Sequence, residues 1–82
     1  MSKQYVCPVC GFNKLAEEPF GKNNEPSFEI CSCCGFESGA DGDNRPARFN
    51  EYRKQWIKEG AQWLLPNLKP KNWDYRKQLE NL

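Results

Sequence analysis

Four of the five cysteines form two pairs with the same internal spacing. Two residues between paired cysteines allow a tight turn to direct both sulfurs at one ion, and two such turns complete a tetrahedral site. A second C-x₂-C pair that follows the first after about 20 residues is typical of structural zinc sites. We therefore predict one Zn²⁺ ion bound by Cys7, Cys10, Cys31 and Cys34.

Both pairs belong to the repeated sequence C-x-x-C-G-F, which begins at Cys7 and again at Cys31. Glycine adopts the positive φ that a turn curling back toward the sulfurs can require, which gives Gly11 and Gly35 a role. Backbone N–H groups in such turns could donate to the thiolates and orient them. The repeat predicts two equivalent cysteine loops around one ion.

A closed set of four thiolates is typical of a structural metal, because a catalytic zinc keeps an open position. Tetrahedral sulfur ligands also accept iron. The C-P-x-C-G segment from Cys7 to Gly11 resembles that of rubredoxins, which makes an iron electron carrier the minor alternative. The same segment resembles a thioredoxin-type redox motif, but no βαβ pattern surrounds it.

The fifth cysteine, Cys33, could replace Cys31 or Cys34 as a ligand. Because the repeat aligns Cys31 and Cys34 with the first pair, we expect Cys33 to be a free thiol. A neighbouring centre of net negative charge should reduce its reactivity.

Short β-prone runs precede both cysteine pairs, at residues 4–6 and 27–30. In the second run Phe28 and Ile30 alternate with polar residues, as in a half-buried strand. Turn-forming residues fill positions 19–26. We therefore predict short antiparallel β hairpins that carry the two cysteine turns, the arrangement of a zinc ribbon.

A helix should follow the glycine- and aspartate-rich segment 39–44, with Asp43 or Asn44 as its cap and Pro46 in its first turn. Its aromatic residues recur at helical spacing and should pack on the ribbon; they are Phe49, Tyr52, Trp56 and Trp63. The helix should end near Glu59 at Gly60, or continue to Leu65.

Pro66 and Pro70 then break the chain, and residues 72–82 should form a short C-terminal helix. The predicted fold is thus a small α+β single domain over residues 1–82. Residues 1–40 form a Cys₄ zinc ribbon, and residues 41–82 form a helical extension that packs on it.

With 82 residues, a core of this size rarely supplies more than about 3–5 kcal/mol, so a bound metal would add needed stability. No apolar run approaches the ~20 residues that span a bilayer, and the start Met1–Tyr5 lacks the apolar stretch of a signal peptide. We therefore expect a cytoplasmic protein without a membrane partner, in which cysteines stay reduced and available to a metal.

The sequence from Tyr5 to Phe12 and the segment Ser27-Phe28-Glu29-Ile30-Cys31-x-x-Cys34 resemble the small bacterial cysteine-rich proteins named for a CPCC motif. The resemblance covers about residues 5–60. It departs where Val9 stands in place of a cysteine and where Glu37 alone remains of an acidic stretch. It implies a zinc ribbon and a bacterial source, and no established activity.

The chain lacks histidine, a phosphate-binding glycine loop and a nucleophile motif, so we predict that it is not an enzyme and has no small-molecule substrate. Its many aromatic residues predict a protein-interaction module, with Trp73 as a contact because it lies beyond two prolines. The alternative is nucleic-acid binding by the mildly basic second half. Its candidate contacts are Arg45, Arg48, Arg53 and Lys54.

Overall fold

The computed structural model describes residues 4–82. Residues 1–3, which belong to the start that predicts no signal peptide, lie outside the described part of the chain. Within residues 4–82 no helix is long and apolar enough to cross a bilayer.

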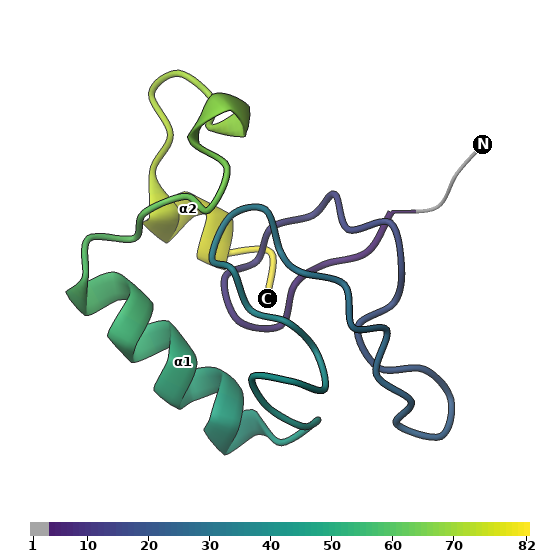
Figure 1. The fold of residues 1–82 in the computed structure, drawn as a ribbon. Helices are drawn as coiled ribbons and strands as arrows, with labels where there is room; N and C mark the ends of the chain where they lie inside the picture. The colour runs from purple at the N-terminus through teal and green to yellow at the C-terminus, as the bar shows by residue number, and fades with distance from the viewer. Residues whose placement is uncertain (1–3) are drawn as a thin grey trace.

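No β-strand forms among the described residues, so the prediction of a zinc ribbon with β hairpins is wrong (Figure 1). Only isolated bridges remain. Two of them, Tyr5–Leu15 and Ile30–Glu37, flank the two cysteine turns, which are residues 7–10 and 31–34. The pairing cannot spread into a ladder because prolines lack an N–H and because Phe28 has a φ of 59°. The molecule is a small compact protein whose regular structure is helical.

The expected half-buried strand at residues 27–30 is replaced by an irregular segment. Phe28 and Ile30 are 57% and 49% exposed, contrary to the predicted alternation. The intervening Glu29 accepts the backbone N–H groups of Ala16 and Glu17 at 3.0 and 2.8 Å. A carboxylate therefore connects this segment to residues 16 and 17, which lie between the two cysteine pairs.

Helix α1 spans Pro46–Lys58 and is the longest element (Figure 1). Proline suits its first turn because the ring fixes a helical φ where the N–H has no partner. The N-cap is Arg45 rather than the predicted Asp43 or Asn44, and no side chain caps the helix.

Helix α1 ends in a Schellman motif, which excludes the longer predicted helix. Gly60 has a φ of 103°. Its N–H donates to the Ile57 carbonyl at 3.0 Å, and the Ala61 N–H donates to the Trp56 carbonyl at 2.8 Å.

A 3₁₀ helix η1 (Pro66–Leu68) and the short helix α2 (Tyr75–Leu79) complete the chain. Helix α2 is shorter than the predicted 72–82 because Asn72 has a φ of 58°, outside the helical region. Asp74 begins the helix by accepting the Arg76 N–H at 2.9 Å.

The core joins the cysteine turns to the helices. Phe36 is 2% exposed and lies edge-on to Phe49 and Tyr52, with ring centroids 5.8 and 5.2 Å apart. Trp56 and Trp63 are buried as well, at 5% and 8% exposure. Phe49 and Tyr52 of α1 therefore pack on Phe36 beside the second cysteine turn. Trp63, which the spacing assigns to the same helix face, lies beyond the end of α1.

Candidate metal centre

The sulfurs of Cys7, Cys10, Cys31 and Cys34 all lie within 4.8 Å of one another, and all four residues are buried. Sγ of Cys7 is 3.7 Å from that of Cys34, and Sγ of Cys10 is 3.6 Å from that of Cys31. A tetrahedron with metal–sulfur bonds of about 2.3 Å has edges of about 3.8 Å. The group therefore has the geometry to hold one tetrahedral metal ion.

The two cysteine turns have the same backbone geometry. Gly11 N–H donates to the Cys7 carbonyl and Gly35 N–H donates to the Cys31 carbonyl, both at 2.9 Å. The two glycines have φ values of 82° and 83°. The repeat in the sequence is thus a repeat in the backbone, and glycine allows each turn to close.

The sulfurs interact strongly because they are buried together. Hydrogen bonding to Cys10 raises the pKa of both Cys7 and Cys34, and burial raises it further. The pKa of Cys31 is lowered because its thiolate accepts hydrogen bonds, and the bond from Cys10 has the largest effect. Four thiolates at these distances repel one another, and a divalent cation would supply the opposing charge.

Arg53 of helix α1 donates hydrogen bonds to the backbone of the first cysteine turn. Its guanidinium donates to the Val9 carbonyl through Nε and to the Pro8 carbonyl through Nη2, the latter at 2.9 Å. Nη1 donates to Asn50 Oδ1, also at 2.9 Å. The side chain therefore positions two ligand-flanking carbonyls and is not free to contact a phosphate.

The segment that follows α1 donates backbone hydrogen bonds to the second cysteine turn. Leu64 N–H donates to the Cys33 carbonyl at 2.9 Å, and Leu65 N–H donates to the Ser32 carbonyl at 3.0 Å. These bonds satisfy carbonyls between the two ligands Cys31 and Cys34.

Helix α2 covers the first cysteine turn from the other end of the chain (Figure 1). Gln78 Nε2 donates to the Cys10 carbonyl at 3.0 Å, and Asn81 Nδ2 donates to the Gly11 carbonyl at 2.9 Å. A Cβ on Gly11 would clash with the Gln78 carbonyl, so the two backbones touch.

Cys33 is fully buried but stands outside the four-sulfur group. Its Sγ accepts a hydrogen bond from Gln78 Nε2 at 3.3 Å. Cys33 therefore belongs to the second cysteine turn and directs its sulfur to Gln78 of helix α2.

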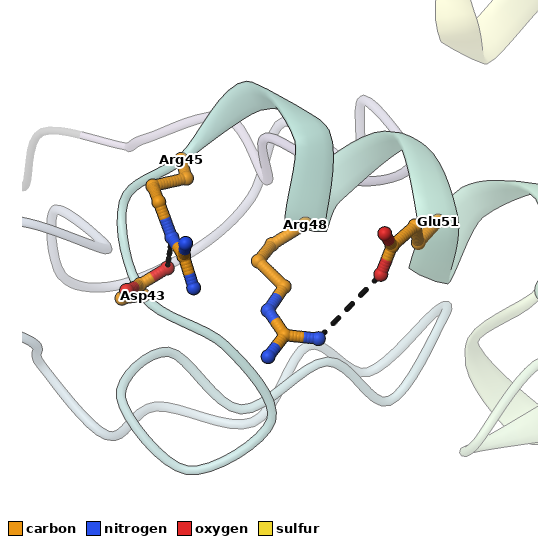
Figure 2. A network of polar contacts seen from close by, with 4 residues as sticks. All are labelled: Asp43, Arg45, Arg48 and Glu51. Atoms are coloured by element: carbon orange, nitrogen blue, oxygen red, sulfur yellow. Dashed lines mark hydrogen bonds and ion pairs between the residues drawn. The ribbon is translucent and has the colours of Figure 1, made fainter.

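The remaining candidate contacts are separate from the centre. Arg45 Nε pairs with Asp43 Oδ1 at 2.7 Å, and Arg48 Nη1 pairs with Glu51 Oε2 at 3.5 Å (Figure 2). The Asp43 pKa is lowered by the Arg45 hydrogen bond. Lys54 is exposed. Two of the predicted phosphate-binding cations thus already face carboxylates.

Trp73 is partly buried rather than free of the core. Its ring lies edge-on to Trp63 and Trp56, with centroids 5.4 and 6.1 Å apart. Its Nε1 donates to Gln78 Oε1 at 2.9 Å.

Sequence reasoning did not identify the positioning roles of Arg53 and Gln78. Their partners Val9 and Cys10 lie 44 and 68 positions away. No local pattern marks such contacts.

No family model matches the chain, and no solved structure matches it. Two Bacillus subtilis proteins are similar to it. "Uncharacterized protein YoaQ" is 35% identical over a 74-residue alignment that covers 73% of this chain and 63% of YoaQ. "Uncharacterized protein YozI" is 33% identical over an 81-residue alignment that covers 80% of this chain and 67% of YozI. The chain thus spans about two thirds of the length of these relatives, and it belongs to the protein family of YozI.

Proposed function

We propose that this chain is a non-enzymatic protein-interaction module whose fold depends on one structural Zn²⁺ ion. The observation that carries the metal assignment is the buried group of four sulfurs within 4.8 Å of one another. The resemblance to the CPCC-type proteins implies zinc and supports this choice of metal.

The ion would join the two halves of the first forty residues. Among the described residues no sheet connects the two cysteine turns, and the sulfurs are a main point at which they meet. Bound zinc supplies four bonds there and offsets the thiolate charge. Because an unfolded chain has no preformed site, the free energy of metal binding becomes free energy of folding.

A closed set of four protein ligands leaves no position for a substrate on the ion, which favours a structural role over catalysis. The function would then reside on the surface that the centre supports. Aromatic residues around Trp73 favour a protein partner, since Trp and Tyr are enriched in interfaces.

Nucleic-acid binding has weaker support. Arg45 and Arg48 are paired with carboxylates, and Arg53 is occupied by backbone carbonyls. Counterion release requires cations that are free to meet phosphates.

Metal analysis of the purified protein tests the centre. We expect one zinc per chain, and loss of the folded state when a strong chelator removes it. Iron with a visible thiolate absorption would instead identify an electron carrier. A protein that folds equally well without any metal would disprove a structural role.

Partner capture from cell extract, followed by binding of the purified partner, tests the interaction role. A matched sample treated with nuclease separates protein from nucleic-acid contacts. Binding that survives nuclease but is lost with the metal is expected. Binding that disappears with nuclease would favour the nucleic-acid alternative.

A further inference from the structure

A groove of about 750 Å³ lies between the segment after α1 and the segment that leads into α2. Three aromatic and two cationic side chains line it, and the aromatic rings pack edge-on against one another or against Trp56. They are Trp63, Trp73 and Tyr75, together with Lys69 and Arg76.

The backbone around this groove is unusual. Ala61 and Asn72 line it with φ values of 51° and 58°. Asparagine adopts this region readily, whereas alanine is strained there, and strained positions cluster at functional sites. Ala61 follows the end of α1 and Asn72 precedes α2, so the two residues belong to the two segments that bound the groove.

A cation covers each of two rings in the groove. Lys69 Nζ lies 5.8 Å from the centre of the Trp73 ring, and Arg76 Cζ lies 5.8 Å from the centre of the Tyr75 ring. The groove has one carboxylate, Asp74, which already accepts the Arg76 N–H and pairs with its guanidinium. Arg76 is thus already paired with Asp74, and Lys69 leaves the groove with an excess of positive charge, which favours an acidic occupant.

Outside the aromatic cluster, the apolar residue Pro66 also lines the groove. Leu65 and Leu68, close to it in the chain, are 48% and 54% exposed. An apolar residue of the occupant would contact Pro66 there.

The indole of Trp63 adds a polar requirement. Trp63 lines the groove, is 8% exposed, and its Nε1 has no hydrogen-bond partner among the described residues. A buried donor without a partner is costly. The Trp63 indole is therefore an unsatisfied polar group beside the groove.

We propose that this groove binds an extended acidic peptide segment of a partner protein, with apolar or proline residues against Pro66 and the edges of the aromatic rings and carboxylates on Lys69 and Arg76. Aromatic-lined grooves recognise extended segments in this way. The inference rests on the proposed function in that the partner is a protein. It adds the surface and the chemistry of the segment bound.

The geometry favours a peptide over a nucleotide. Base stacking needs an open aromatic face. Cations lie over the Trp73 and Tyr75 rings, and the ring of Trp73 also packs on two other tryptophans. These cations offer donors to carboxylates while limiting access to the faces.

The test uses the zinc-loaded full chain labelled with ¹⁵N. The probes are a short peptide that alternates glutamate with leucine and proline, the same peptide with glutamine for glutamate, and an oligothymidine. We expect the acidic peptide alone to shift amides of the groove segments 60–66 and 69–76. Binding should weaken by roughly tenfold in the double variant Lys69→Glu, Arg76→Glu.

The double variant Lys14→Glu, Lys22→Glu is the matched control, because it makes the same charge change on exposed lysines that do not line the groove. It should bind the acidic peptide with unchanged affinity. Retained zinc and unchanged amide dispersion verify the fold of both variants.

The proposal is overturned if neither peptide binds at millimolar concentration, if the glutamine peptide binds equally, or if oligothymidine occupies the groove instead. Shifts that centre on Phe28 and Ile30 would also overturn it. Shifts at Phe28 and Ile30 would contradict the groove but remain consistent with a protein-interaction function. A protein that contains no metal and folds without one would instead contradict the proposed function itself.

Discussion

The side-chain amide of Gln78 donates to the backbone carbonyl of Cys10 across 68 positions of the chain. The same nitrogen contacts Cys33 Sγ, and the amide oxygen accepts the Trp73 indole N–H. One side chain therefore connects the first cysteine turn, the second turn and the wall of the groove. Changes at the metal centre should reach the groove through it.

Gln78→Ala should lower the free energy of unfolding by about 1–3 kcal/mol, because partly buried donors and acceptors lose their partners. Urea unfolding of the zinc-loaded protein measures this change. Gln55→Ala is the control, since Gln55 bonds only to exposed Glu59 on the same helix and should cost no more than about 0.5 kcal/mol. Equal losses in both variants would show that Gln78 does not connect the turns.

Gly11→Ala and Gly35→Ala should differ although both glycines have the same φ. Each substitution imposes a left-handed conformation on alanine, at a cost of about 1–2 kcal/mol. At Gly35 a Cβ would meet nothing closer than 3.8 Å, whereas at Gly11 it would clash with the Gln78 carbonyl. Gly11→Ala should therefore lose a further ~1–3 kcal/mol as helix α2 is displaced.

Amide exchange in residues 75–79 measures that displacement directly. Faster exchange in Gly11→Ala alone is expected. Equal exchange in both variants would contradict the close packing of α2 on the first turn.

Cys33→Ser should bind zinc with the stoichiometry of the parent protein, while serine at any of the four grouped cysteines should not. The reason is that Cys33 lies outside the four-sulfur group. Metal analysis after gel filtration, with circular dichroism to follow folding, measures both properties. Loss of zinc from Cys33→Ser together with retained zinc in a variant of Cys31 or Cys34 would reassign the ligands.

Arg53→Ala should destabilise the protein by about 2 kcal/mol, because the Pro8 and Val9 carbonyls lose a charged donor. The neighbouring Lys54→Ala should change stability by no more than about 0.5 kcal/mol. Chemical denaturation of both variants checks this. If Arg53→Ala is as stable as Lys54→Ala, the guanidinium is not a fastening for the first turn.

The sequence pattern was informative where interactions are local. The spacing of the cysteines and glycines predicts two like turns, and these turns have matching backbone bonds. Binding of an ion by the four cysteines stays a prediction. Helix α1 was also predictable, because its aromatic spacing and Pro46 act within one element.

The pattern failed where a contact joins distant segments. The alternation of Phe28 and Ile30 predicts a strand, but a strand needs a partner whose N–H groups are free, and neighbouring prolines remove donors. Glu29 instead accepts hydrogen bonds from the backbone N–H groups of Ala16 and Glu17. Nothing near Gln78 in the sequence indicates its contact with Cys10.

The last prediction concerns Asp74, the N-cap of α2. The Arg76 backbone N–H, and then its guanidinium, lower the Asp74 pKa below its ordinary value of 3.8. A lowered carboxyl pKa means that the ionised form stabilises the fold. This contribution is fully present above pH 3.8 and is lost as the pH falls through the lowered pKa.

Asp74→Asn keeps a capping oxygen but removes the charge. The difference in unfolding free energy between the parent protein and Asp74→Asn should therefore be constant from neutral pH to about pH 3.8 and should narrow below it. Urea unfolding with excess zinc measures the difference at each pH at which both proteins retain the metal. Glu80→Gln makes the same charge change at the other end of α2 and lacks the bond to Arg76, so it controls for net charge. A difference that widens in acid would mean that Asp74 is held in its protonated form, opposite to the direction set by Arg76.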